Sequence, residues 1–475
     1  MSELPEGWAS TRIGELTSKI GSGATPRGGA KAYKLSGTPL LRSLNIHFDG
    51  VRDEGIAYID DEQAAKLDNV EVETSDVLLN ITGASIGRVA IAPERYKGAR
   101  VNQHVAIIRT VDGVVPSFLS RYLASPDAQS RIFTENYGVT RQALTKGMIE
   151  DFPVSLPPLP EQRRIVAKLD RLSARSAAAR DHLARTAKLA TRAKQAVLRN
   201  AFAGSITERW RAARMVPPVA TDRDGIDGRV PDLGDIPSAW GWRAVSSICE
   251  VSGGLTKNRA RADMPRKAPY LRVANVYANE LRLDEVTEIG CTKADIERTL
   301  LQAGDLLVVE GNGSQDQIGR VAVWTGEVDG CLHQNHLIRV RPKPSVSSAF
   351  LLYWMLSPNG RTAIETVASS SSGLHTLSLS KVKGMPVPLC SKMEQAEIVR
   401  RIEAAFARID RVTKEASRAA HLLDRLDERL LARAFRGELV PQDPDDEPAE
   451  ALLARIREAR AAAPKPKRGR RKAST

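Results

Sequence analysis

Two globular segments of the chain share the same pattern of short apolar runs broken by Gly, Pro, Asn and Ser. Runs such as Val105–Ile108 and Val321–Trp324 have the length and β-branched content of buried strands. Each segment then continues into a stretch with helical character, Phe118–Phe133 or Phe350–Val367, that is interrupted by a Ser-Pro pair. The pattern therefore predicts two mixed α/β domains.

Each globular segment is followed by a long stretch without Gly or Pro. Residues 161–203 and 391–436 each predict a single helix, and about 43 residues at ~1.5 Å per residue span roughly 65 Å. Apolar or small residues recur along both stretches at alternating steps of four and three, which is the spacing of a coiled-coil seam. The seam residues are Ile165, Leu169, Leu172, Ser176, Ala179, Leu183, Thr186, Ala190, Ala193 and Val197, then Ile398, Ile402, Ala405, Ile409, Val412, Ala416, Ala419, Leu423, Leu426 and Leu430.

The whole arrangement occurs twice in the sequence, at an offset near 232 residues. A collinear series of matches of this kind indicates an internal repeat rather than chance. The matching segments include Leu4–Trp8 with Ile236–Trp240, Pro39–Arg42 with Pro269–Arg272, Ile86–Ala90 with Ile318–Ala322, Glu161–Gln162 with Glu394–Gln395, and Ala201–Gly204 with Ala434–Gly437.

These patterns predict an α+β fold of two pseudo-repeated mixed α/β domains, each followed by a long helix. We favour pairing of the two helices as an antiparallel coiled coil, because helices of this length cannot bury an apolar stripe on a small domain. The alternative is that each helix packs only on its own domain. The expected division is 1–157 and 236–390 for the domains, 158–206 for a central helix, 391–440 for a distal helix, 207–235 for a surface linker, and 441–475 for an acidic then basic, partly disordered tail with a short helix over 449–463.

The net charge of +13 is concentrated in two places. Residues 161–203 hold eleven Lys/Arg and three acids, a net of +8, and residues 464–475 hold six Lys/Arg and no acid. These two segments together exceed the net charge of the whole chain, so the globular domains are not collectively basic. The charge points toward nucleic acid, but it does not by itself place a nucleic-acid surface on the domains.

Composition and terminal sequence indicate a folded protein of the cytoplasm. Hydrophobic residues make up 42% and charged residues 27% of the chain, and no apolar run reaches membrane-spanning length. The N-terminus lacks the pattern of a signal peptide. The four cysteines are far apart and form no CxxC pair, so neither a disulfide framework nor a zinc ribbon is indicated.

The ordered set of motifs resembles the specificity subunit of type I restriction–modification systems over nearly the whole chain. The family's opening Pro-x-Gly-Trp segment is present as Pro5–Trp8, its Gly-x-Thr-Pro element as Gly23–Pro26, and its Pro-Pro-x-x-Glu-Gln-x-x-Ile junction as Pro157–Ile165. A polar loop, Gly138–Gln142, precedes the junction. The second copy lacks the double proline before Glu394 and the proline after Thr256.

The resemblance implies a non-catalytic reader of a bipartite site in double-stranded DNA. Each target-recognition domain would read one half-site, and the paired helices would set the gap. Two methylation subunits would dock on the long helices, and restriction subunits can join them. The resemblance also implies that this chain binds no cofactor, and that S-adenosylmethionine, ATP and Mg belong to the partner subunits.

Two other classes of function are weighed against this one. A self-contained DNA methyltransferase or nuclease is disfavoured, because the chain has no Asn-Pro-Pro-aromatic motif and no Gly-Lys dipeptide for a phosphate loop. Cys331, His333 and His336 could suggest a metal site, but no fourth ligand lies near them in the sequence. A coiled-coil scaffold without a DNA role stays open, and salt-sensitive DNA retention would separate it from a reader.

Base readout requires Arg, Lys, Asn, Gln and similar side chains on loops that reach the groove. For any single residue, a solvated surface position is the simpler interpretation. Arg42 with Arg272, and Arg88 with Arg320, recur in place, which favours a shared framework role over sequence choice. The candidate DNA-binding residues are Arg27, Lys31, Arg42, Asn45, Ser85, Arg88, Thr140, Arg141 and Gln142 in the first copy, and Lys257, Asn258, Arg259, Arg272, Asn275, Asn312, Gln315, Arg320 and His375 in the second.

Overall fold

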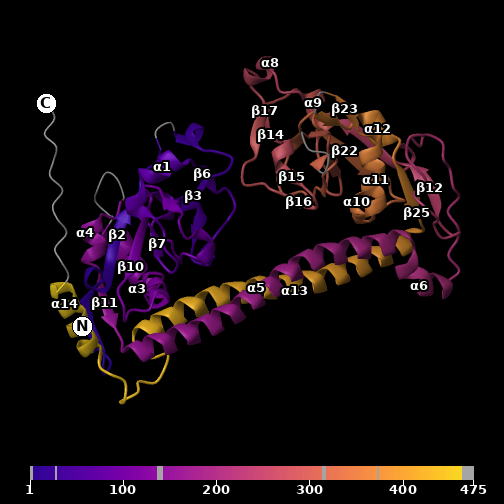
Figure 1. Cartoon of the computed structure of the whole chain (residues 1–475). Helices are drawn as coiled ribbons and strands as arrows, with labels where there is room; N and C mark the ends of the chain where they lie inside the picture. Colours follow the sequence, from indigo (N-terminus) through magenta and orange to yellow (C-terminus); the bar gives the residue numbers. More distant parts are fainter. Residues whose placement is uncertain (1–3, 27–28, 136–142, 313–316, 372–373, 463–475) are drawn as a thin grey trace. The chain divides into compact units, whose positions relative to one another are not determined.

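The computed structural model describes residues 4–26, 29–135, 143–312, 317–371 and 374–462 (Figure 1). The chain divides into two compact units. Unit 1 comprises Met1–Leu183 and Arg418–Thr475, and unit 2 comprises Ala184–Ser417. Each unit therefore holds one globular repeat and one part of each long helix.

A four-stranded antiparallel sheet forms the centre of unit 1. Its order is β2-β10-β7-β8, with the bounds Thr17–Ser22, Val105–Thr110, Val77–Asn80 and Val89–Ile91. Successive residues of β7 face two different cores: Val77 and Leu79 pack with α2 (Pro116–Leu123), whereas Leu78 packs toward a second sheet. That sheet has the order β6-β3-β9, with the bounds Ala57–Ile59, Thr38–Leu41 and Arg100–Val101. Burial on both faces explains why these strands are continuous apolar runs.

Unit 2 repeats the same topology. Its main sheet has the order β13-β22-β18-β20, with the bounds Cys249–Gly253, Leu337–Pro342, Leu306–Val309 and Val321–Val323. Its second sheet, β17-β14-β21, spans Thr287–Gly290, Lys267–Leu271 and Leu332–His333. The predicted Ser-Pro interruptions are confirmed, because α2 and α10 (Ser348–Leu356) each give way at a Ser-Pro pair to a second helix, α3 (Pro126–Glu135) or α11 (Pro358–Val367).

Smaller elements complete the two units. In unit 1 they are β1 (Ala9–Arg12) paired with β11 (Pro153–Leu156), β4 (Ile46–His47) with β5 (Gly50–Val51), α1 (Asp61–Ala65), α4 (Lys146–Glu150) and α14 (Ala449–Ala462). In unit 2 they are β12 (Gly241–Ala244) with β25 (Pro386–Leu389), β15 (Val276–Tyr277) with β16 (Glu280–Leu281), β19 (Gly311–Asn312) with β24 (Leu374–Thr376) and β23 (Ser369–Ser371), α6 (Glu208–Ala212), α7 (Val245–Ile248), α8 (Arg259–Ala262), α9 (Lys293–Thr299) and α12 (Leu379–Lys383).

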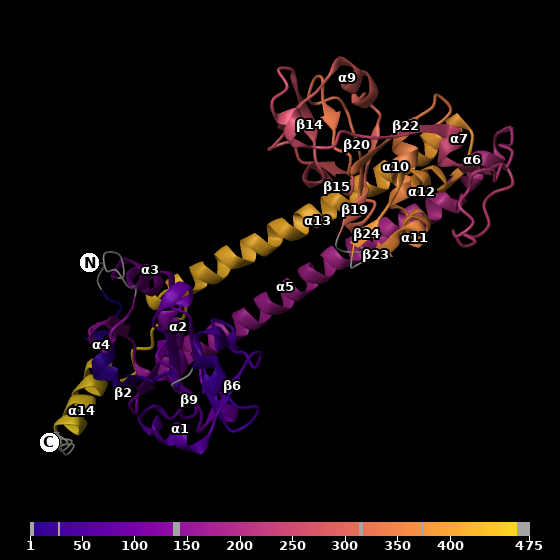
Figure 2. The same ribbon diagram turned by 90° about the horizontal axis from the view of Figure 1, so that it is seen from above.

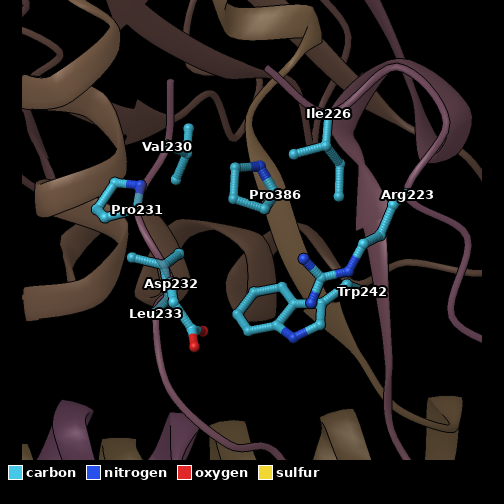
Figure 3. A pocket seen from close by; sticks show the side chains of 8 residues that line it. All are labelled: Arg223, Ile226, Val230, Pro231, Asp232, Leu233, Trp242 and Pro386. Atoms are coloured by element: carbon cyan, nitrogen blue, oxygen red, sulfur yellow. The ribbon is translucent and has the colours of Figure 1, made fainter. Parts of the chain in front are cut away.

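The segment expected to be a linker lies on the surface of unit 2. Its backbone is tied down where Asp227 N donates to Gly384 O at 2.8 Å. The segment from Arg223 to Leu233 lines a small pocket together with Trp242 and Pro386 (Figure 3). After the second long helix, α14 packs on the core of unit 1 through Leu452, Leu453 and Ile456.

The two long helices are α5 (Leu159–Phe202) and α13 (Lys392–Phe435), and they pair antiparallel in each unit (Figure 2). In unit 1, Ser176 Oγ donates to Asp427 Oδ1 at 2.8 Å, and Arg180 contacts Asp424 at 2.9 Å. In unit 2, Lys194 Nζ lies 2.6 Å from Asp410. Residue numbers rise along α5 as they fall along α13. The predicted antiparallel pairing is therefore confirmed.

Every residue of the seam predicted for α5 is buried or partly buried, but the seam predicted for α13 is wrong at two positions. Val412 is 55% exposed and Leu426 is 46% exposed, whereas the next residues, Thr413 and Asp427, are partly shielded. An α-helix has 3.6 residues per turn, so a strict 3.5-residue spacing drifts off the contact face. At Asp427, hydrogen bonding to Ser176 and Arg180 favours a polar residue at the contact.

A buried glutamine joins each long helix to its globular domain. In unit 1 the Gln162 side chain accepts a hydrogen bond from Val115 N at 2.9 Å and donates to Pro157 O at 3.0 Å. In unit 2 Gln395 accepts from Ser347 N at 2.8 Å and donates to Cys390 O at 2.9 Å. The preceding glutamate, Glu161, accepts from Trp8 Nε1 at 3.0 Å. In unit 1, the Trp and Glu-Gln motifs thus form a structural joint.

Replacing Gln162 with alanine should destabilise the protein by about 1–3 kcal/mol, because the Val115 amide loses its acceptor in a buried site. Gln195→Ala on the exposed part of α5 is the matched control and should change the free energy of unfolding by less than about 0.5 kcal/mol. Urea titration followed by circular dichroism measures both. Equal stabilities for the two variants would show that the joint contributes nothing.

Candidate DNA-recognition surface

An open hollow of about 400 Å³ lies between two of the predicted loops in unit 1. One loop follows β3 and the other joins β7 to β8. The buried Asn80 side chain ties them together by donating from Nδ2 to Ser43 O at 2.9 Å and to Ser85 Oγ at 3.1 Å. The lining residues are Ser43, Leu44, Thr82, Gly83, Ala84, Ser85, Arg88 and His104. The structure thus brings the candidates Ser85 and Arg88 into one concave site.

Asn45 and Asn275 shape these loops from inside. The Oδ1 atom of Asn45 accepts from Arg42 N at 3.0 Å, and its Nδ2 donates to Arg52 O at 3.2 Å. Asn275 makes the same bonds, to Arg272 N at 2.8 Å and to Arg282 O at 2.8 Å. Both side chains are buried and hydrogen-bonded on both sides. Their role is to position the loop rather than to face a ligand.

The recurring arginines are half-buried, and two of them, Arg42 and Arg320, stack on tyrosine rings. The Arg42 guanidinium lies 5.1 Å from the centre of the Tyr33 ring and donates to Gly55 O. Arg320 lies 4.8 Å from the ring centre of Tyr277. Arg272 lies 3.8 Å from Glu285. Stacking of this kind holds a guanidinium in place at the edge of a loop.

The DNA-binding candidates predicted from the sequence omitted a histidine in each unit. His104 lines the hollow of unit 1, where Nδ1 bonds the Thr82 hydroxyl. The equivalent residue of unit 2, His336, contacts Glu310 Oε2 through Nδ1 at 3.0 Å. Ile81 N donates to His104 O and Glu310 N donates to His336 O, which establishes the equivalence. Each histidine follows an Asn and a Gln, as Asn102-Gln103-His104 and Gln334-Asn335-His336, and this recurrence was the available signal.

Three candidates of unit 2 lie exposed at the loop after β13. Asn258 caps α8, because its Oδ1 accepts from Arg261 N at 3.0 Å. Arg261 is in turn fixed by Asp295 at 2.8 Å. Lys257 and Arg259 flank the cap and are exposed. A rigid cap thus presents two cations to solvent.

The remaining candidates are only partly described. Residues Arg27, Thr140, Arg141, Gln142 and Gln315 lie outside the described residues, and the same holds for the side chains of Lys31, Asn312 and His375. The backbone pairing of Asn312 with His375 brings two predicted loops of unit 2 together. In unit 1, the bridge from Thr82 to Ala143 is the counterpart.

The three residues that could have suggested a metal site have separate partners. Cys331 is buried and donates to Leu332 O, His333 bonds Thr299 O at 3.0 Å, and His336 faces Glu310. No group of three or more His, Cys, Asp or Glu side chains suited to a metal ion occurs in the described part of the chain. Within the same residues, no helix is both long and apolar enough to cross a bilayer.

The two units share one frame and present different side chains from equivalent loops, as expected of a duplicated recognition protein. Residues 5–183 and 237–418 match the family described as "Type I restriction modification DNA specificity domain". The chain belongs to this family. It is the DNA-recognition component of a restriction–modification system and not a catalytic subunit.

Relatives and solved structures agree with this assignment. The chain is 25% identical over 490 residues, 99% of each chain, to the type I restriction enzyme EcoKI specificity subunit of Escherichia coli strain K12. It is 25% identical over 492 residues, again 99% of each chain, to the StySPI specificity subunit of Salmonella potsdam. The HsdS subunit from Thermoanaerobacter tengcongensis has the same fold, with a TM-score of 0.55 and 19% identity over 92% of this chain and 98% of that chain. A chain from a study of complex assembly and conformational transition of the type I R-M system gives a TM-score of 0.63 and 18% identity, over 92% and 100%.

Because His333 is buried, we expect the free energy of unfolding to depend on pH. Burial lowers the pKa of His333 to about 4 from its usual 6.5, so the unfolded chain takes up a proton more readily than the folded one. Stability should therefore fall as pH decreases from about 6.5 to 4, by about 3 kcal/mol from this group. His333→Gln should flatten that part of the profile of unfolding free energy against pH. An unchanged slope in the variant would contradict the assignment.

Proposed function

We propose that the chain reads a bipartite site in double-stranded DNA, with residues 1–157 reading one half and residues 236–390 the other. The observation that carries this proposal is the duplicated loop frame. In both copies a buried asparagine, Asn45 or Asn275, shapes the equivalent loop, and in unit 1 this loop lines the hollow. The side chains on that frame differ: Thr82 meets His104 in one copy, and Glu310 meets His336 in the other. A shared frame with different chemistry suits two different half-sites.

The candidate residues divide by the contacts they can make. Arg88 and Arg320, with the exposed Lys257 and Arg259, supply cations that contact phosphates or the acceptor edge of guanine. Ser85 and His104 at the hollow donate or accept single hydrogen bonds. The candidates whose residues or side chains lie outside the described part of the chain belong to the same proposed surface: Arg27, Lys31, Thr140, Arg141, Gln142, Asn312, Gln315 and His375.

The long helices are the proposed platform for the catalytic partners. Two methylation subunits would dock on them and hold S-adenosylmethionine, and restriction subunits that use ATP and Mg can join the complex. The support is that α5 and α13 cover only one stripe of each other and leave their remaining faces exposed. The length of the paired helices would set the gap between half-sites.

Exchanging Ile236–Pro388 for the matching segment of a relative should change one half of the methylated motif and leave the other half intact. Methylome sequencing of cells that carry the assembled complex measures the motif. The point variants Arg88→Ala and Arg320→Ala, at recurring framework positions, are a matched pair, and each should weaken methylation without changing either half of the motif. A change in both halves from one exchange would contradict modular reading.

Lengthening both helices should widen the gap. Inserting four residues after Thr186 and four after the equivalent Ala419 adds about 6 Å to each helix, which corresponds to one or two base pairs of DNA. A four-residue insertion disturbs the seam only modestly, so the fold should persist. The readout is again the methylated motif. An active complex with an unchanged gap would show that helix length does not set the spacing.

A further inference from the structure

An exposed leucine between two arginines occurs once on each long helix. On α5, within unit 2, Arg185, Leu189 and Arg192 follow the pattern Arg-x-x-x-Leu-x-x-Arg. On α13, within unit 1, the same pattern recurs at Arg418, Leu422 and Arg425. The side chains of Leu189 and Leu422 are 60% and 54% exposed. The offset of 233 residues is the one that relates the two seams, so the two sets occupy equivalent positions.

Each set lies on one face of its helix, away from the helix pair's own ion pairs. At about 100° per residue, both arginines fall within about 60° of the leucine between them. Arg180 and Lys194, which pair with acids of α13, lie more than about 120° from Leu189 on α5. Among the described residues, no carboxylate lies within ion-pair distance of Arg185, Arg192, Arg418 or Arg425. Each face therefore carries a bare apolar group and two uncompensated cations.

A single exposed leucine needs no explanation, because scattered apolar residues are normal on protein surfaces. Recurrence at equivalent positions, each time with both arginines, is a different observation. On α13 the face is extended by Leu426, which is 46% exposed beside Leu422. Leu426 turns outward because the strict seam spacing drifts off the helix contact. Leu426 therefore enlarges the apolar face around Leu422. Two matched faces in one chain fit two copies of one partner.

The chemistry of the face favours a protein over DNA as its occupant. Phosphates would pair with the arginines, but a leucine contributes nothing to a backbone contact. A protein surface with an apolar pocket rimmed by Asp or Glu satisfies all three side chains, and it has the usual anatomy of an interface core with a charged rim. Charge complementarity therefore specifies an acidic, apolar partner surface.

We propose that the faces Arg185–Leu189–Arg192 and Arg418–Leu422–Arg425 are two equivalent docking points, each taking one methylation subunit through an apolar pocket with an acidic rim. This inference rests on the proposed function, in which methylation subunits dock on the long helices. It adds the residues that hold them and the chemistry of the surface that meets them.

The test counts methylation subunits in the assembled complex by native mass spectrometry. The unaltered chain should carry two copies, Leu189→Asp and Leu422→Asp one copy each, and the double variant none. Met393→Asp, at a 69% exposed position on α13 about 43 Å along the helix, is the matched control and should keep two. Because alanine is a better helix former than aspartate, Leu189→Ala with Leu422→Ala repeats the test with less risk to the helix. That pair should weaken the partner's binding at least about tenfold.

Five outcomes decide between the alternatives. Two copies retained by both folded double variants would overturn the proposal, and so would equal loss in Met393→Asp. Retained stoichiometry with weakened DNA binding would assign the face to DNA and also overturn it. A chain without substitutions that binds no methylation subunit would instead refute the proposed function. Arg185→Glu with Arg192→Glu should remove one copy if the rim is acidic, and its retention would refute the charge assignment.

Discussion

The rigid joint at the start of each long helix controls where the recognition loops can lie within each unit. Gln162 and Gln395 are buried amides whose oxygen and nitrogen are both hydrogen-bonded to the backbone of the preceding globular domain. An unsatisfied amide in that position would cost more than the bonds gain, so the joint is specific as well as stabilising. Because these bonds fix the start of the helix on its domain, the loops keep a fixed relation to that helix.

The two copies share the residues that form the loop framework and differ in the side chains that this framework presents. Asn45 and Asn275 make the same internal hydrogen bonds, and the two main sheets have the same order. The two equivalent histidines have different partners: His104 contacts the Thr82 hydroxyl, whereas His336 contacts Glu310, the counterpart of Ile81. Within one loop, the residues that hold the backbone in place are therefore different from the residues that differ between the two copies.

Different faces of the helix pair also carry different kinds of contact. One flank is tied internally, by Arg180 with Asp424 in unit 1 and by Lys194 with Asp410 in unit 2. Another flank carries arginines without acidic partners beside an exposed leucine. Exposed ion pairs contribute little to stability, so the first flank mainly fixes register and direction. The second flank keeps its charge and its apolar surface available for contacts with other molecules.

Periodicity in the sequence determined the duplication, both long helices and their pairing, and apolar runs identified strands such as β10 and β20. The spacing of apolar residues along each stretch shows which face is buried, and the recurrence of the motifs shows the repeat. Tertiary structure decided which polar side chains are internal. Asn45 is a plausible reader in the sequence yet is buried, and Asn80 joins loops 37 residues apart. Leu426 fits a 3.5-residue seam but turns outward, because Asp427 instead bonds Ser176, 251 residues away. Whether a polar group is buried and hydrogen-bonded depends on partners far away in the sequence. The local spacing of residues does not identify those partners.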